Sequence, residues 1–233
     1  MDKLFYAPDI DKNSVLPEDE SKHCTQVLRL KSGEKILITD GKGFTCEAIL
    51  QDIKSGNCKV EVTNRRFQPP CFSEKIHIAV APTKNIDRTE WFVEKATETG
   101  ISKITFLRCQ HSERKEINLN RIKKIAVSAM KQSQKTILPE ISEMIEFKEF
   151  ILQDWDGIKM IAHCEDIERQ HIKKTYQKHT DAVILIGPEG DFSPKEIEMA
   201  VNKGYIPVSL GNSRLRTETA ALMACYAIHI INA

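Results

Sequence analysis

Two short glycine turns late in the chain have the residue types of a ligand-binding site. Residues 187–190 read Gly-Pro-Glu-Gly directly after the apolar run 182–186, and residues 210–213 read Leu-Gly-Asn-Ser at the end of the run 206–210. Glycine lets a ligand approach the backbone closely and proline stiffens a turn, so each turn can present main-chain N–H and C=O groups to a planar base. A plain strand-to-helix connection also explains one such turn, but two in succession favour a binding site.

Two arginines stand between the second turn and a predicted helix. Arg214 and Arg216 precede the helix expected over residues 217–231, and Glu218 lies in its first turn. The helix dipole explains Glu218, because a helix N-terminus favours negative charge, but it does not explain the arginines. We therefore expect an anionic partner for them, namely Glu218, Glu189 or a phosphate.

Several familiar catalytic patterns are absent from the sequence. It contains no G-x-G-x-x-G, no G-x-x-x-x-G-K-[ST] and no G-x-S-x-G motif. Residues 163–166 read His-Cys-Glu-Asp, which are metal-ligating types without a metal-ligand spacing. We therefore expect no metal site, and from the residues alone His163 reads as the polar end of a strand.

The composition indicates a reduced, non-membrane protein. The chain has 233 residues, 41% of them hydrophobic. It has no apolar run of about 18 residues, so no transmembrane helix is expected. The N-terminus lacks a secretory signal pattern, and the seven cysteines include no C-x-x-C pair. We therefore expect reduced thiols and a cytoplasmic location, with neither a disulfide framework nor a zinc site.

The charge is balanced overall but segregated along the chain. The formal net charge is only +1, which argues against a generally basic nucleic-acid binder. Residues 102–136 nevertheless hold nine Lys or Arg against two acidic residues, whereas residues 137–172 hold three against nine. Such blocks create local fields or form two solvated faces, and the composition alone leaves both readings open.

The first 70 residues read as short strands around one helix. Residues 35–40 and 44–50 flank a Gly-Lys-Gly turn and partly alternate in hydrophobicity, which predicts a hairpin, and residues 58–64 alternate again. A helix is expected between residues 18 and 31. The polar, proline-containing stretch 65–70 breaks the pattern. We therefore predict a small β-barrel domain over residues 1–70.

The rest of the chain alternates between strands and helices. Strands are predicted over 75–81, 104–108, 158–163, 182–186 and 206–210, and helices over 85–99, 118–134, 193–203 and 217–231. The expected N-caps are Asn85, Ser193 and Thr217, and Glu196 completes a capping box with Ser193. This alternation predicts an α/β domain with a parallel sheet over residues 71–233.

One predicted helix carries a basic face. In the helix over 118–134, spacings of three and four residues align Arg121, Lys124, Ser128, Lys131 and, if the helix runs one residue further, Lys135. A basic stripe is usually a solvated surface. Within the basic block, however, we expect this one to contact phosphates.

Taken together, these residues resemble the RsmE-type methyltransferases of the SPOUT superfamily. The two specific matches are LIGPEGDFSPKEI, residues 185–197, and SLGNSRLRTETAALMA, residues 209–224. Weaker matches are His23-x-x-x-Val27-Leu28-Arg29, the stretch from Lys84-x-x-x-Arg88-x-Glu90 to Gly100, and residues 129–133. The departures from residues common in that family are Gln26, Thr99, Lys135 and Asp191.

The resemblance implies an S-adenosylmethionine (SAM)-dependent enzyme that methylates N3 of a uridine in small-subunit (16S) ribosomal RNA. It also implies a C-terminal trefoil-knot domain and an N-terminal PUA-like RNA-binding domain. The knot is implied by the resemblance alone, because general topology rules disfavour knotted chains. The implied cofactor-binding residues are His163, Leu185, Ile186, Gly187, Pro188, Glu189, Gly190, Leu210, Gly211, Leu215, Arg216 and Ala220.

Methyl transfer from a sulfonium needs orientation and desolvation, and it needs no covalent nucleophile from the protein. N3 of uracil carries a proton at neutral pH, so either a general base removes it or cations stabilise the oxyanion that develops. By charge type and motif position, Glu218 is the expected base. Arg216, Arg88 and Lys84 are the expected cations, which hold either that oxyanion or a phosphate.

The expected partners are small-subunit ribosomal RNA, free or in the assembled small ribosomal subunit, and a second copy of the chain. The expected RNA contacts are His23, Arg29, Lys84, Arg88, Arg121, Lys124, Lys131, Lys135 and Arg214. The family is generally homodimeric. The helix over 217–231 is apolar nearly all round, which requires burial either within the monomer or at an interface.

Two other functions stay open from the sequence. The first is a SPOUT methyltransferase for another RNA site, such as a ribose 2′-OH or a transfer RNA. The second is a non-catalytic RNA-binding or ribosome-assembly factor, which would need no cofactor loop.

Overall fold

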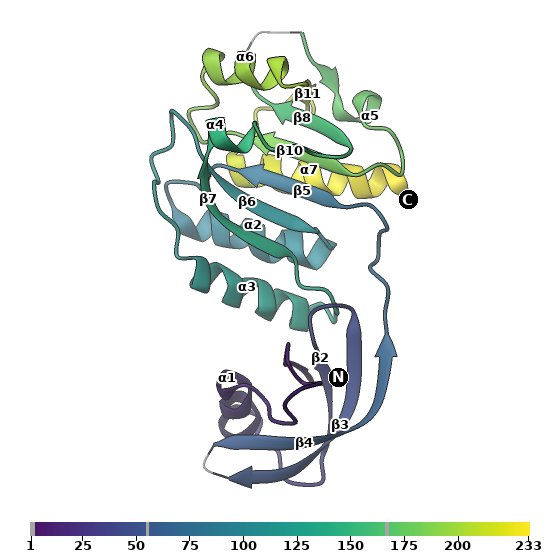
Figure 1. Ribbon diagram of the computed structural model, residues 1–233. Helices are drawn as coiled ribbons and strands as arrows, with labels where there is room; N and C mark the ends of the chain where they lie inside the picture. The colour runs from purple at the N-terminus through teal and green to yellow at the C-terminus, as the bar shows by residue number, and fades with distance from the viewer. Residues whose placement is uncertain (1–2, 55, 166–167) are drawn as a thin grey trace. The chain divides into compact units, whose positions relative to one another are not determined.

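The computed structural model describes residues 3–54, 56–165 and 168–233, and the chain forms two compact units (Figure 1). The first comprises the residues up to Cys71 together with Val127–Leu138, and the second comprises Phe72–Ala126 and Pro139–Ala233. Helix α3 (Leu119–Gln132) is therefore divided between them. The sequence assigned residues 1–70 and 71–233 to two domains. Residues 127–138, which pack with the first unit, lie inside the second of these ranges.

The first unit is built on a four-stranded sheet in the order β1-β2-β3-β4. Its strands are β1 (Leu4–Tyr6), β2 (Lys35–Thr39), β3 (Phe44–Lys54) and β4 (Asn57–Phe67). β1 pairs in parallel with β2, and the remaining neighbours pair antiparallel. The predicted hairpin is confirmed. Gly41 and Gly43 in its turn have φ of 74° and 102°, a region that favours glycine.

Two sequence predictions for this unit need correction. β1 was missed, and β4 continues to Phe67, so the pattern break expected at residues 65–70 was placed too early. The helix expected between residues 18 and 31 is also shorter at its end. α1 (Glu18–Lys22) continues into the π-helix η1 (His23–Val27), and the chain then turns away because Arg29 has a left-handed φ of 52°.

The second unit is built on a seven-stranded sheet in the order β7-β6-β5-β10-β8-β11-β9, in which all neighbours are parallel. The strands are β5 (Ile76–Val80), β6 (Lys103–Arg108), β7 (Glu140–Glu146), β8 (Ile158–Ala162), β9 (Gln170–His171), β10 (Ala182–Ile186) and β11 (Ile206–Ser209). Every residue of β5 and β10 is buried, as expected for strands covered on both faces. The predicted parallel α/β sheet is confirmed.

The sequence missed the two edge strands of this sheet. β7 reads EISEMIE, and only its Ile141 is buried, so its glutamates obscure the apolar signal. β9 has only two residues and carries no pattern. Edge strands contact neighbours on one side, so their sequences are less constrained than those of central strands.

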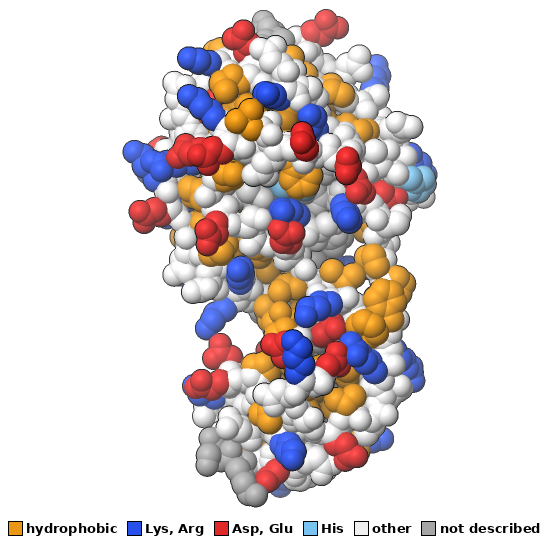
Figure 2. All heavy atoms as spheres, in the orientation of Figure 1, with side chains coloured by type: hydrophobic (Ala, Val, Ile, Leu, Met, Phe, Trp, Pro, Cys, Tyr) orange, Lys and Arg blue, Asp and Glu red, His pale blue; other side chains and the backbone are white. Residues whose placement is uncertain are grey.

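The pairing of β6 with β7 also explains the segregated charge of the sequence. Lys103 lies 2.6 Å from Glu140, and Arg108 lies 3.2 Å from Glu146. The basic and acidic blocks therefore neutralise each other in part across adjacent strands. On the face drawn in Figure 2, Lys and Arg side chains are interspersed with Asp and Glu side chains.

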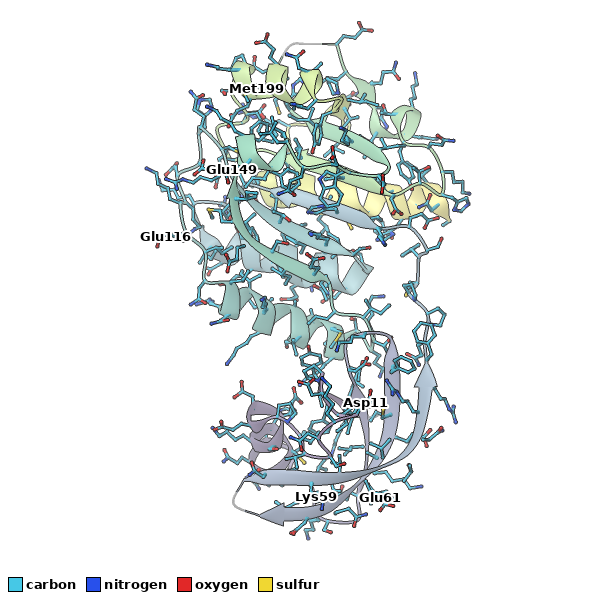
Figure 3. The ribbon with its side chains drawn as sticks, viewed as in Figure 1. Asp11, Lys59, Glu61, Glu116, Glu149 and Met199 are labelled. Carbon is cyan, nitrogen blue, oxygen red and sulfur yellow. The ribbon has the colours of Figure 1, made fainter. Side chains whose placement is uncertain are left out.

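Helices cover both faces of the sheet. They are α2 (Ile86–Thr99), the first part of α3, α4 (Phe147–Phe150), α5 (Ile172–Thr175), α6 (Pro194–Asn202) and α7 (Thr217–Asn232). α7 packs on β5, β10 and α2. On the other face, Leu185 of β10 packs with Phe150 of α4 and Ile197 of α6. Figure 3 labels Glu149 and Met199 on these two helices.

Local side-chain bonds set the helix ends. Asn85 accepts a hydrogen bond from the Asp87 amide at 3.1 Å, and Ser193 and Glu196 form the predicted capping box. The N-cap predicted at Thr217 is wrong, because Arg216 occupies that position without a side-chain cap. Among the described residues, no helix combines the length and the apolar character needed to span a membrane.

Candidate functional site

A pocket of about 820 Å³ lies at the carboxyl ends of β8, β10 and β11. Its walls are the loop after β8, the turn 187–191 after β10, and the end of β11 with residues 210–216 that follow it. These strands are neighbours, and Ala162 is aligned with both Ile186 and Val208, so the loops begin at the same level. The structure thus brings the two predicted glycine turns to one pocket, at the edge where open parallel sheets bind ligands.

All but one of the residues predicted to bind a cofactor line this pocket. The lining set is His163, Ile186, Gly187, Pro188, Glu189, Gly190, Leu210, Gly211, Leu215, Arg216 and Ala220. The exception is Leu185, whose side chain is buried in the core. In the predicted segment after His163, Cys164 and Glu165 line the pocket, whereas residues 166–167 lie outside the described residues.

Close packing explains the two glycines of the first turn. A Cβ on Gly187 would lie 3.0 Å from the Phe192 nitrogen, and one on Gly190 would lie 3.1 Å from the His111 Cβ. The left-handed residue of the turn is Asp191, with φ of 61°. Aspartate tolerates this region better than most residues, and its Oδ2 accepts a hydrogen bond from the Cys164 amide at 2.6 Å. The departure from glycine at Asp191 therefore joins two walls of the pocket.

Polar contacts from the loops after β5 and β6 brace the same turn. The Glu189 carboxylate accepts a hydrogen bond from the Lys84 amide at 2.9 Å. Arg114 donates to the Thr83 carbonyl at 3.0 Å and to the Lys84 carbonyl at 2.7 Å. Nδ1 of His111 lies 3.1 Å from the Gly190 carbonyl oxygen, so this nitrogen must carry the proton.

Three residues at the site were not predicted from the sequence: Arg114, His111 and the pocket-lining Arg169. The available signal was position, because each follows a strand of the parallel sheet at its carboxyl end. The partners of Arg114 and His111 are far away along the chain, so no spacing rule connects them.

His163 is the first residue after β8, and its ring is buried in the pocket wall. Within the described residues, neither ring nitrogen has a hydrogen-bond partner. Burial, and next the Arg169 guanidinium, lower the pKa of His163, while Asp191 and Glu165 oppose this shift. Arg169 also donates a hydrogen bond to the His163 carbonyl.

Arg214 and Arg216 also line the pocket, and both are exposed. Two of their three expected partners are engaged elsewhere, since Glu189 accepts from the Lys84 amide and Glu218 lies beside Arg88. Within the described residues neither arginine forms an ion pair.

Glu218 lies in the first turn of α7, with its side chain only 9% exposed. Its Oε1 is 3.9 Å from Nε of Arg88, and its Oε2 has no hydrogen-bond partner within the described residues. Neither Glu218 nor Arg88 is among the residues that line the pocket. The neighbouring Thr217 donates a hydrogen bond to the Gly187 carbonyl at 3.1 Å, which fastens α7 to the first glycine turn.

Lys84 is the fourth residue predicted to act in catalysis, and it too lies outside the pocket lining. Its ammonium group is 2.8 Å from Glu113, and this hydrogen bond raises the pKa of Lys84. Its amide holds Glu189, so Lys84 contacts the glycine turn through its backbone.

The predicted RNA contacts have varied surroundings. The ring of His23 meets the edge of Phe5, with centroids 6.1 Å apart, and Arg29 is exposed. Arg121 pairs with Glu90 at 2.5 and 2.8 Å, and Lys131 pairs with Glu20 at 2.6 Å. Lys124 lies on α3, between Arg121 and Lys131 in the sequence.

The basic stripe predicted on this helix needs one correction. α3 ends at Gln132, so Lys135 does not belong to it, and its ammonium group lies 3.4 Å from Sγ of Cys71. The described residues also contain no cluster of His, Cys, Asp or Glu that could hold a metal ion.

A parallel sheet that is covered on both faces and carries a pocket at its carboxyl edge defines an α/β protein with a candidate ligand-binding site. Residues 70–229 match the family model of an RNA methyltransferase domain, and residues 16–63 match that of an RNA methyltransferase PUA domain. The first match covers more than half of the chain, so the protein belongs to this family of RNA methyltransferases. The predicted fold class and the resemblance to RsmE-type proteins are confirmed.

Individual relatives agree with the family models. The Ribosomal RNA small subunit methyltransferase E of Mycobacterium tuberculosis is 25% identical over 98% of this chain and 91% of the relative. The protein of the same name from Bacillus subtilis is 27% identical over 90% and 87%.

Solved structures extend the comparison to the whole fold. A probable rRNA-methyltransferase from Porphyromonas gingivalis is 41% identical, with a TM-score of 0.93, and the match covers 99% of this chain and 98% of that one. A Legionella pneumophila structure in complex with SAM is 26% identical, with a TM-score of 0.88 and the same coverage.

Proposed function

We propose that the protein is a SAM-dependent methyltransferase that methylates N3 of a uridine in small-subunit ribosomal RNA. The observation that carries this proposal is the meeting of three main-chain loops in one pocket at the carboxyl edge of the sheet. The names of the relatives support ribosomal RNA as the substrate, and the SAM-bound Legionella structure supports the cofactor.

The pocket fits an adenosyl cofactor in size and in chemistry. A volume of about 820 Å³ is in the range of small-molecule sites. The glycine turns offer main-chain groups, and the buried His163 offers ring nitrogens without partners. When bound, SAM supplies an electrophilic methyl group on a sulfonium sulfur. The proposed contacts are the pocket-lining residues predicted from the sequence, without Leu185.

Proton removal from N3 is the step that this chain's residues must provide. Glu218 is the proposed base, because its Oε2 is buried and has free lone pairs to accept a proton. Arg88, 3.9 Å from the same carboxylate, is the cation proposed to stabilise negative charge on the uracil oxygens. Arg216 in the pocket wall and the ammonium group of Lys84 are the remaining proposed cations.

RNA binding is proposed for basic groups on both units. The PUA match over residues 16–63 supports this role for His23 and Arg29. Lys131 and Lys135, which lie in the same compact unit, are proposed beside them. In the second unit the proposed contacts are Lys84, Arg88, Arg121, Lys124 and Arg214. Because Arg121 and Lys131 are paired with glutamates, their contribution requires exchange of those partners for phosphates.

A homodimer is also proposed, and the final helix supports it. Met223, Tyr226 and Ile230 are 43%, 48% and 61% exposed, at spacings that place them on one side of α7. The opposite side of α7 is buried within the unit. An exposed apolar stripe of this kind is typical of an interface.

The decisive experiment is methylation with tritium-labelled SAM, using naked ribosomal RNA and isolated small subunits in parallel. Mass spectrometry of the digested nucleosides should find 3-methyluridine. A methyl group on a ribose hydroxyl or on transfer RNA would instead establish another target. Calorimetry that detects no SAM binding would favour a non-catalytic assembly factor.

A further inference from the structure

One polar side chain in the pocket wall has no hydrogen-bonding role within the described chain. His163 is 5% exposed, and both of its ring nitrogens lack partners there. Its pKa is lowered by burial, so the ring is neutral and carries one N–H donor and one bare nitrogen acceptor. Buried polar groups are almost always satisfied in native proteins, so a ligand is the natural source of the missing partners.

The backbone around this ring is held on both sides. The His163 carbonyl accepts a hydrogen bond from Arg169, and the amide of the next residue, Cys164, donates to Asp191 at 2.6 Å. The backbone that carries the ring is therefore held in place in the pocket wall.

The place of His163 in the sheet indicates which part of a ligand it meets. β8 lies between β10 and β11, and the register aligns its last residue with the last residue of β10. His163 thus follows the middle strand, with Gly187 on one side and Ser209 on the other. When a molecule reaches from one glycine turn to the other, its central part therefore lies next to the His163 ring.

We propose that the His163 side chain hydrogen-bonds the ribose hydroxyls of the adenosyl group, which rests on the proposed function. The ribose is the middle part of SAM, between the adenine and the sulfonium. Each hydroxyl can both donate and accept, which matches a neutral imidazole. The glycine turns on either side offer main-chain groups of fixed direction, which suit the edge of a base.

The chain offers a matched control in a second buried histidine. His77 is 2% exposed, its Nδ1 also lacks a partner within the described residues, and burial lowers its pKa to about 3. Its ring packs against Trp155 and Phe150, and it is not among the pocket-lining residues. His77→Phe therefore removes a buried imidazole without touching the proposed site.

The test is calorimetry with S-adenosylhomocysteine, adenosine and 2′,3′-dideoxyadenosine. Wild type should bind adenosine more tightly than the dideoxy compound. His163→Phe should bind S-adenosylhomocysteine about tenfold more weakly and should lose most of that preference. His163→Gln, which keeps a donor and an acceptor, should recover part of both, and His77→Phe should match wild type.

Three results would overturn the proposal. They are wild-type affinity of His163→Phe for S-adenosylhomocysteine, an unchanged preference for adenosine in that variant, and equal binding of the two nucleosides by wild type. The last result needs no variant, so it decides the matter even if His163→Phe does not fold. Failure of wild type to bind S-adenosylhomocysteine at all would instead contradict the proposed function.

Discussion

Two sets of polar groups, one at the amino edge and one at the carboxyl edge of the parallel sheet, differ in whether their members have partners. At the amino edge, where the strands begin, Glu74, Tyr176, His179 and Asn232 bond one another. Nδ1 of His179 lies 2.6 Å from Glu74, the His179 amide donates to Asn232 at 3.0 Å, and Asn232 donates to the Tyr176 hydroxyl at 3.0 Å. At the carboxyl edge, within the described residues, the ring of His163 and Oε2 of Glu218 have no partner.

This difference illustrates two roles that buried polar groups can have. A closed network satisfies its members and stabilises one conformation, whereas an open group keeps its bonding capacity for something that arrives later. Substitutions at the amino edge should therefore change stability and leave chemistry intact, and substitutions at the carboxyl edge should do the reverse.

The largest expected effect is at Glu218. Glu218→Gln keeps the size of the side chain but removes the proton acceptor, so methyl transfer to RNA should fall by about 10²-fold or more. Affinity for S-adenosylhomocysteine and the melting temperature should stay near wild type. Glu198→Gln, on the exposed side of α6, is the control. Undiminished turnover by Glu218→Gln would remove Glu218 as the base.

An intermediate effect is expected where the carboxyl edge is braced. Arg114→Ala removes the two hydrogen bonds to the Thr83 and Lys84 carbonyls, which loosens the segment that holds Glu189. Methyl transfer should fall about tenfold, because small displacements of a site are costly in rate. Arg114→Lys can replace only part of this geometry, so its methyl-transfer activity should lie between those of wild type and Arg114→Ala. Equal activity of all three proteins would show that the brace is dispensable.

At the amino edge, Glu74→Gln should lower stability by about 1 kcal/mol at neutral pH and leave methyl transfer unchanged. The hydrogen bond from His179 lowers the pKa of Glu74, so its contribution is present above the pKa of the unfolded state. It is lost as the pH falls through the lowered value. The melting temperatures of the two proteins should therefore differ at pH 6 and converge as the pH falls below the lowered pKa of Glu74. A difference that stays constant with pH would contradict the hydrogen bond between His179 and Glu74.

The smallest effect is expected for an exposed charge of the first unit. Arg29→Asn keeps a residue that tolerates the left-handed backbone there, and it should weaken RNA binding a few-fold for every sequence tested. The slope of log affinity against log salt should drop by about one. Filter binding over a range of salt concentrations measures both, and an unchanged slope would exclude a phosphate contact at Arg29.

The sequence predicted the parts of the fold that local patterns control. The apolar runs of β5 and β10, the capping box at Ser193 and the glycine turn after β10 were all readable, because burial, capping and turn geometry act over a few residues. The wrong N-cap at Thr217 shows the limit. Its hydroxyl bonds the Gly187 carbonyl, thirty residues away, and long-range partners leave no mark in spacing.

The main-chain turns of the site were predictable from the sequence, but the side chains that brace them were not. Arg114 and His111 act on segments 31 and 79 residues distant, so only their position after β6 hinted at a role. The charge blocks left two readings open for a similar reason, because β7 was not foreseen and its glutamates therefore had no visible partners.

The contact between Thr217 and Gly187 ties the outside of the molecule to its pocket. One end of α7 rests on the wall of the ligand site, and farther along the same rod Met223, Tyr226 and Ile230 face outward. A molecule that binds this exposed apolar stripe and displaces α7 must also move the pocket wall. By thermodynamic linkage, a ligand that favours one conformation of the pocket wall changes the affinity of that molecule for the stripe by the same factor.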